Sequence, residues 1–198
     1  MYLLNSRYCM VVAAIACLAG CGRQERMEAV EFSKALSDHQ VNFVKANTIE
    51  KEFVSNARAW CDWITASGAG RGVELDQNAT VATELAKSAV AVSEQLSEVR
   101  MAIDAQTLTG EYPRHIRNVL TTQLTQRQRM LQDMRALLEQ SAPQFLQFKN
   151  STAYKGDSYP DGIGKLGALL RVYEAPADTV GGALTELKTR YRLSGSGI

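Results

Sequence analysis

The chain has 198 residues, of which 22 are basic and 21 acidic. This length is enough for one domain with its own hydrophobic core. The balanced charge, without a cluster of Lys and Arg, excludes the usual electrostatic footprint of a nucleic-acid-binding protein, and it supplies no polybasic patch for a membrane surface.

The chain begins with an apolar segment that ends at a cysteine. Residues 9–19 are uniformly apolar, Arg7 is the only charged residue before them, and a polar run starts at Gly22. The apolar segment is far shorter than the roughly 20 residues that a membrane-spanning helix needs. We therefore expect residues 1–20 to be a signal peptide that is removed after translocation.

The last residues of this segment, Leu18-Ala19-Gly20-Cys21, resemble the lipobox of bacterial lipoproteins. The resemblance implies that Cys21 is acylated and that the precursor is cut directly before it. Two or more acyl chains hold a protein stably on a bilayer. In a Gram-negative host, Gly22 after the cysteine implies sorting to the outer membrane, on its periplasmic side. The expected cofactor content is the covalent lipid alone.

The spacing of glycines predicts three long helices in the mature chain. Glycine is absent between residues 23 and 67, 73 and 109, and 111 and 155, and it gathers at the boundaries. In each segment apolar residues recur three or four positions apart, which is typical of a helix with one buried face. The first of these faces is expected to contain Ala29, Phe32, Leu36, His39, Phe43, Ala46, Glu50, Phe53, Ala57, Trp60 and Ile64.

Turn residues give the expected limits of these helices. Residues 67–72 form a glycine-rich corner, and Asp76 is a suitable N-cap for the second helix. Gly110 is expected to end that helix, and Pro113 is expected to lie in the first turn of the third. Pro143 predicts a kink or break near Ser141.

The end of the chain predicts a shorter, broken fourth helix. Residues 163–173 and 180–191 are amphipathic and are divided at Ala175-Pro176, while residues 193–198 should form a flexible tail. No segment shows the alternation of apolar and polar residues that is typical of a strand. The predicted fold is all-α, an elongated antiparallel helical bundle covering residues 21–192, with three long helices and the broken fourth.

Two charged residues interrupt the predicted apolar faces. Glu50 lies between Ala46 and Phe53, and Arg127 lies between Leu124 and Leu131. Folding the chain at its two corners brings residues 50 and 127 within one helical turn of the same height. We expect an ion pair that sets the alignment of the first and third helices, since a buried carboxylate without a partner is strongly destabilising. The alternative is a pair at the solvated edge that contributes under about 1 kcal/mol.

Two further motifs have both a functional and a structural interpretation. Residues 162–167 spell G-x-G-x-x-G, but a turn precedes them instead of the strand that a dinucleotide site requires, so a helix start with close packing is favoured. In Trp60-Cys61-Asp62-Trp63, Trp60 belongs to the apolar face and Trp63 is a possible interaction surface. Cys61 is interpreted as a structural residue, because neither histidine is near enough in sequence to activate its thiol.

The sequence contains no catalytic constellation, so we expect a membrane-anchored envelope lipoprotein that acts as a structural or protein-interaction component and is not an enzyme. Its expected partners are the bilayer and another envelope protein, with no nucleic acid. One alternative is a bundle that holds haem or a metal through His39 and His115, which fall at similar predicted heights. Another is a bundle that binds a hydrophobic ligand, since the first helix is rich in phenylalanine.

Overall fold

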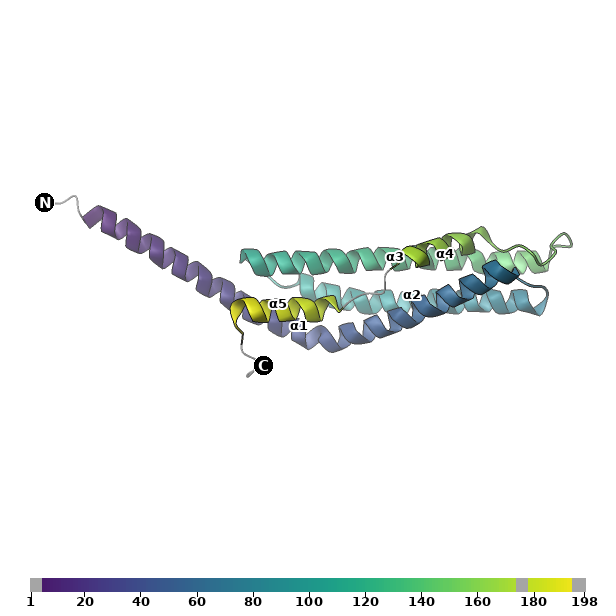
Figure 1. Ribbon diagram of the computed structural model, residues 1–198, viewed down its shortest axis with the longest axis horizontal. Coiled ribbons are helices and arrows are strands. Elements are labelled where there is room, and N and C mark those ends of the chain that lie inside the picture. The colour runs from purple at the N-terminus through teal and green to yellow at the C-terminus, as the bar shows by residue number, and fades with distance from the viewer. Residues whose placement is uncertain (1–4, 174–177, 194–198) are drawn as a thin grey trace. The chain divides into compact units, whose positions relative to one another are not determined.

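All regular secondary structure in the described part of the chain is helical. The computed structural model describes residues 5–173 and 178–193, with side chains from Gly22 onward, and contains no strand within them. Its elements are α1 (Asn5–Ser67), α2 (Val73–Asp104), α3 (Glu111–Lys149), α4 (Asp161–Val172) and α5 (Thr179–Tyr191) (Figure 1). The predicted all-α helical bundle is confirmed, and both short helices of the C-terminal region are present.

The chain forms two compact units, each assembled from stretches that are far apart in the sequence. Unit 1 consists of Met1–Gln40, Met101–Thr122 and Thr179–Ile198. Unit 2 consists of Val41–Arg100 and Gln123–Asp178. Each of the three long helices contributes one part to both units, while α4 belongs to unit 2 and α5 to unit 1.

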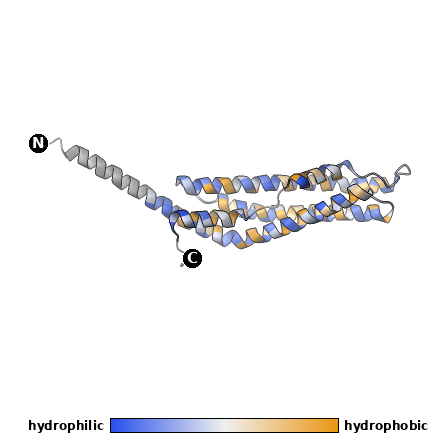
Figure 2. Cartoon of the chain, in the orientation of Figure 1, coloured by the Kyte–Doolittle hydropathy of each residue, from blue (hydrophilic) through white to orange (hydrophobic). Residues whose placement is uncertain are grey.

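The buried faces of the helices are those that the three-four spacing predicts. Apolar and polar residues alternate around each helix (Figure 2), so every helix has one side to bury. The three-four spacing in α2 selects positions that are all buried, namely Ala82, Leu85, Ala89, Val92, Leu96, Val99 and Ile103. Along α1 every predicted position is buried except His39 and Trp60, which are partly exposed. In α3 the same spacing selects positions of which only Arg127 and Phe148 are partly exposed, namely Ile116, Leu120, Leu124, Arg127, Leu131, Met134, Leu138, Phe145 and Phe148. The core of unit 1 contains Ala29, Phe32, Leu36, Ile103, Leu108, Ile116, Leu120, Val180, Ala183, Leu184 and Leu187.

Four expectations about the helix limits are wrong. Helix α2 ends at Asp104, well before Gly110. The polar run that follows Cys21, residues 22–25, is expected from the sequence to separate the lipid from the first helix, but α1 already includes it. Helix α2 begins at Val73, so Asp76 lies in its first turn instead of capping it, and its carboxylate is held by Lys149 at 2.6 Å. Helix α3 continues through Pro143 to Lys149 without a break. Its face stays buried on both sides of the proline, at Leu138 and Phe145, and this packing outweighs the roughly 3 kcal/mol that an internal proline costs.

Two loops of unit 2 are held against each other. In the corner after α1, Gly68 has φ +77°, and a Cβ there would lie 2.4 Å from the carbonyl oxygen of Gly156, so only glycine fits. The backbone N–H of Ala69 donates to Ser158 O at 3.2 Å, and Arg71 Nε donates to Lys155 O at 2.8 Å. The glycine-rich corner therefore serves close approach of backbones as well as chain reversal.

Candidate functional site

Two carboxylates of α1 bind the backbone at the start of α3. The first N–H groups of a helix have no partner within the helix. Glu28 accepts hydrogen bonds from the backbone N–H groups of Thr109, at 2.9 Å, and Gly110, at 2.7 Å, and also from the Thr109 hydroxyl. One turn earlier, Glu25 accepts from the N–H of Tyr112 at 3.1 Å. Negative charge at this end of α3 also complements the helix dipole.

These hydrogen bonds shift the ionisation of Glu28. Donation by the Thr109 hydroxyl and the Gly110 N–H lowers the pKa of Glu28 below its ordinary value, because both bonds favour the ionised carboxylate. Gly110 itself is closely confined, since a Cβ there would lie 2.6 Å from Glu25 Cγ. The junction between α2 and α3 is thus fitted to the surface of α1.

Tyr112 joins α3 to α5. Its hydroxyl donates a hydrogen bond to the Glu186 carboxylate, and this bond raises the pKa of Tyr112 above its ordinary value. The guanidinium of Arg190 lies over the Tyr112 ring, with Cζ 3.6 Å from the ring centroid, which is the geometry of a cation–π interaction. The stack holds the guanidinium of Arg190 against the Tyr112 ring.

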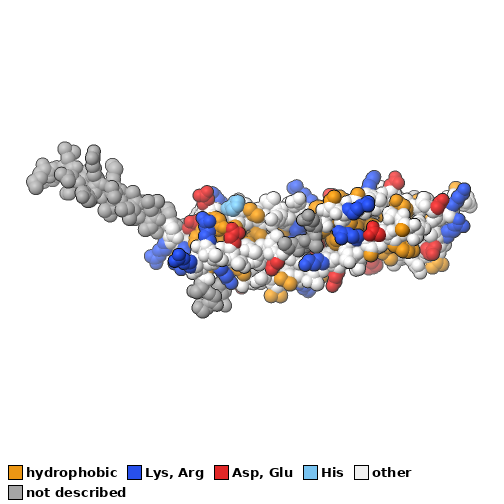
Figure 3. Space-filling view, in the orientation of Figure 1, with side chains coloured by type: hydrophobic (Ala, Val, Ile, Leu, Met, Phe, Trp, Pro, Cys, Tyr) orange, Lys and Arg blue, Asp and Glu red, His pale blue; other side chains and the backbone are white. Residues whose placement is uncertain are grey.

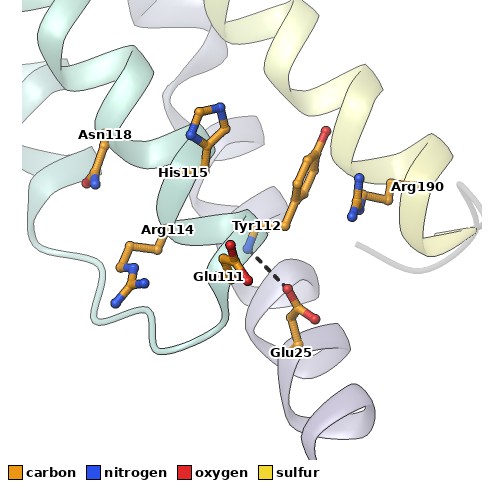
Figure 4. Close-up of a pocket in the computed structure, with 7 residues that line it drawn as sticks. All are labelled: Glu25, Glu111, Tyr112, Arg114, His115, Asn118 and Arg190. Atoms are coloured by element: carbon orange, nitrogen blue, oxygen red, sulfur yellow. Dashed lines mark hydrogen bonds between the residues drawn. The ribbon is translucent and has the colours of Figure 1, made fainter.

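A polar pocket of about 540 Å³ opens beside this junction in unit 1. Figure 4 shows its residues arriving from three helices, with the dashed hydrogen bond from the Tyr112 backbone to Glu25. It is lined by Glu25 of α1, by Glu111, Tyr112, Arg114, His115 and Asn118 of α3, and by Arg190 of α5. Two carboxylates and two guanidiniums thus line one cavity, which suits a ligand that carries charges of both signs.

A second polar group is buried inside unit 2. Glu50 is fully buried and forms an ion pair with Arg127, whose Nε lies 3.3 Å from Glu50 Oε1 and whose Nη2 bonds to Oε2. Arg127 Nη2 also donates to Asn47 Oδ1 at 2.6 Å, and the Tyr173 hydroxyl donates to Glu50. Burial and the charge of Glu50 raise the pKa of Tyr173 above its ordinary value. The predicted pair is present and largely buried, and the solvated-edge alternative does not apply.

The residues around Trp60 have structural roles. Trp60 donates its indole N–H to Asn78 Oδ1 at 3.1 Å and lies 6.0 Å from the Phe145 ring, centroid to centroid. Cys61 is buried, and burial together with the charge of Asp62 raises the pKa of its thiol to about 12, so it is not a nucleophile at neutral pH. Trp63 is 48% exposed, the condition that an interaction residue needs.

The glycine motif of α4 serves close packing. A Cβ on Gly162 would lie 2.4 Å from Ser141 Oγ and 3.1 Å from Leu137 O of α3. Gly162 is the second residue of α4, so the motif opens a helix as predicted. The preceding loop, residues 150–160, contains no strand, so the βαβ context of a dinucleotide site is missing from this part of the chain.

The two histidines are placed differently. His115 is exposed and lines the pocket of unit 1, with its ring 6.5 Å from that of Tyr112, whereas His39 is partly exposed and is not among the residues that line this pocket. Within the part of the chain that the structure describes, no group of three or more His, Cys, Asp or Glu side chains is arranged to hold a metal ion. The side chain of Cys21 lies outside the described residues, as do residues 1–4.

Sequence reasoning missed the pocket and half of the buried network. Glu25 and Glu28 are spaced three apart on α1, which suggests ordinary solvated acids, and no pattern links them to residue 110 or 112. Tyr173 lies at the end of α4, beyond a loop whose path the sequence does not specify. The signal for Asn47 was available, because it lies one helical turn before the predicted buried Glu50.

Known proteins offer no guide to this site. No family model, curated protein or solved structure is significantly similar to the chain. Among the described residues, no helix is both long and apolar enough to cross a membrane. On the face shown in Figure 3, acidic and basic side chains are interspersed, without a broad patch of one sign.

Proposed function

We propose that this protein is a bacterial envelope lipoprotein, held on a membrane by acyl chains on Cys21, whose helical domain is a structural or protein-interaction component. The observation that carries the proposal is Leu18-Ala19-Gly20-Cys21 at the end of a short apolar segment with a single preceding positive charge. The identity of Gly22 favours the outer membrane, facing the periplasm, in a Gram-negative host.

The structure of α1 is consistent with attachment close to the bilayer. Because α1 is helical from before Gly22 onward, no extended spacer separates Cys21 from the folded domain. A domain mounted in this way stays within a short distance of the lipid surface, which suits a component that organises or contacts other proteins at the membrane.

The anchor is tested with the substitution Cys21→Ser. We expect an uncut precursor that no longer incorporates radiolabelled palmitate, because the acyl chain needs the cysteine thiol. The matched control is Cys17→Ser, in the same segment but outside the four-residue motif, which should be labelled and cut normally. Continued cleavage of the Cys21→Ser protein together with sedimentation in the membrane fraction would overturn the proposal.

The interaction role is tested at Trp63. Large exposed aromatic residues are enriched at the energetic centres of protein interfaces. A photo-crosslinking amino acid at position 63, in intact cells, should capture a defined envelope protein. The same probe at Asp62, which is exposed and one position along the helix, should not capture it. Equal capture at both positions would show that Trp63 does not lie at the contact.

A further inference from the structure

The pocket of unit 1 contains groups of two kinds that the proposed function does not use. Arg114 and Arg190 supply guanidinium donors, which match the geometry of phosphate oxygens. Glu111 and Glu25 supply carboxylates, which accept hydrogen bonds from an ammonium group. In the view of Figure 4, Glu111 lies between the two arginines. The pocket therefore suits a small zwitterion more than an anion or a cation alone.

The pocket also lies close to the proposed anchor. Glu25 and Cys21 are four residues apart on the same helix, so they are separated by about 6 Å along its axis. The headgroup layer on each side of a bilayer is roughly 5–8 Å thick. If Cys21 carries acyl chains, Glu25 therefore lies at the height of the lipid headgroups, and this step rests on the proposed function.

We propose that this pocket binds the phosphoethanolamine headgroup of a membrane phospholipid. Arg114 and Arg190 bind the phosphodiester, with Arg190 already held in place by its stack on Tyr112. Glu111 binds the ammonium group, with Glu25 as its neighbour. Anchoring by Cys21 raises the local concentration of headgroups around the pocket, so a weak site for one headgroup is filled.

The same residues predict discrimination between headgroups. A phosphocholine headgroup carries a trimethylammonium that has no N–H to donate to Glu111. A phosphoglycerol headgroup has the same phosphodiester but no cation, so it supplies no ammonium group to the carboxylates. Ethanolamine alone among the three satisfies both halves of the pocket.

The first experiment uses soluble headgroups, so that it does not depend on the lipid anchor. The full-length expressed protein is extracted in detergent, its processed form is identified by intact mass, and glycerophosphoethanolamine, glycerophosphocholine and glycerophosphoglycerol are titrated by calorimetry. We expect the ethanolamine compound to bind about tenfold more tightly than the other two, the value of one charge-assisted hydrogen bond. Equal binding of all three, or no binding, overturns the proposal.

Substitutions test separately the residues that bind the phosphodiester and the residue that binds the ammonium group. Arg114→Gln, at an exposed position, should weaken binding of glycerophosphoethanolamine about tenfold. Arg26→Gln, an exposed arginine beside Glu25 that does not line the pocket, should leave binding unchanged. Glu111→Gln should abolish the preference for ethanolamine over glycerol. Equal effects of Arg114→Gln and Arg26→Gln would show that general charge, not the pocket, attracts the ligand.

The second experiment identifies the source of the headgroup. Lipids that co-purify with the wild-type protein are compared by mass spectrometry with those of the parent membrane. We expect phosphatidylethanolamine to be enriched, and the enrichment to disappear in Arg114→Gln. If the soluble compound binds but phosphatidylethanolamine is not enriched, the bound headgroup does not come from a membrane phospholipid. An intact mass without acyl chains would overturn the anchor, while the calorimetric titration would still decide whether the pocket binds the headgroup.

Discussion

In unit 2, Glu50, Arg127 and Tyr173 meet inside the bundle, whereas in unit 1 Glu25 and Arg190 contact Tyr112 beside a cavity that solvent can enter. The two sets contain the same types of side chain. Groups sealed from water depend on each other, because a lost partner leaves a charge that nothing else can satisfy. Groups around an open cavity can exchange water for a ligand. We therefore expect the first set to have a structural role, and the second set is the one that we propose to bind a ligand.

The largest predicted effect is in the sealed set. Arg127→Leu leaves the fully buried Glu50 carboxylate without its cation, and we expect the free energy of unfolding to fall by about 3–5 kcal/mol, measured by urea denaturation. The matched control is Arg135→Leu, which breaks the exposed pair with Glu139 on the same helix and should cost under about 1 kcal/mol.

A double-mutant cycle with Glu50→Gln isolates the pair itself. Removing both charges should cost less than the sum of the two single changes, since neither side chain is then left with an unpaired buried charge. A coupling energy no larger than the roughly 0.5 kcal/mol found for independent sites would show that the pair does not set the structure of unit 2.

The next effect tests how tightly α4 is packed on α3 within unit 2. Gly162→Ala places a methyl group 2.4 Å from Ser141 Oγ, so we expect a loss of about 1–3 kcal/mol in the free energy of unfolding. Gly164→Ala, two residues along the same helix, meets nothing closer than Tyr159 Cε2 at 3.9 Å and should stabilise the protein by about 0.4–1 kcal/mol. Effects of the same sign at both positions would contradict the close-packing role of Gly162.

The helical framework was predictable because burial follows the three-four spacing of apolar residues closely. Phe32, Leu96 and Leu124 are fully buried, at positions that the sequence pattern indicates without any knowledge of the neighbouring helices. The pairing of Glu50 with Arg127 was also predictable, since a charge inside an apolar face needs a partner and the heights of antiparallel helices can be counted.

The pocket of unit 1 could not be predicted in the same way. Its residues come from three helices and lie outside the apolar faces, so no periodicity marks them. The hydrogen bonds that Glu28 accepts from the N–H groups of Thr109 and Gly110 depend on the path of a short loop, which sequence spacing does not determine. The end of α2 was placed at Gly110 because glycine commonly ends helices, but the helix ends at Asp104, and Gly110 is required by the close approach of Glu25.

The smallest predicted effect is at Glu28 of unit 1, where solvent can also hydrogen-bond to the polar groups. The folded state lowers the pKa of Glu28 below its ordinary value of 4.5, so the ionised carboxylate binds the loop more strongly than the protonated acid. This contribution to stability is complete above about pH 4.5 and declines as the pH falls through the lower pKa of the folded protein. Glu28→Gln should therefore reduce the free energy of unfolding at pH 7, by under about 1 kcal/mol because Glu28 is partly exposed to solvent. The deficit relative to wild type should shrink when urea denaturation is repeated at lower pH, while Glu31→Gln, an exposed acid one turn along α1, should show no deficit at either pH. A deficit for Glu28→Gln that persists or grows as the acid is protonated would mean that the packing of the Glu28 side chain, not its charge, holds this loop against α1. The polar groups of unit 1 would then depend on one another as much as those of unit 2.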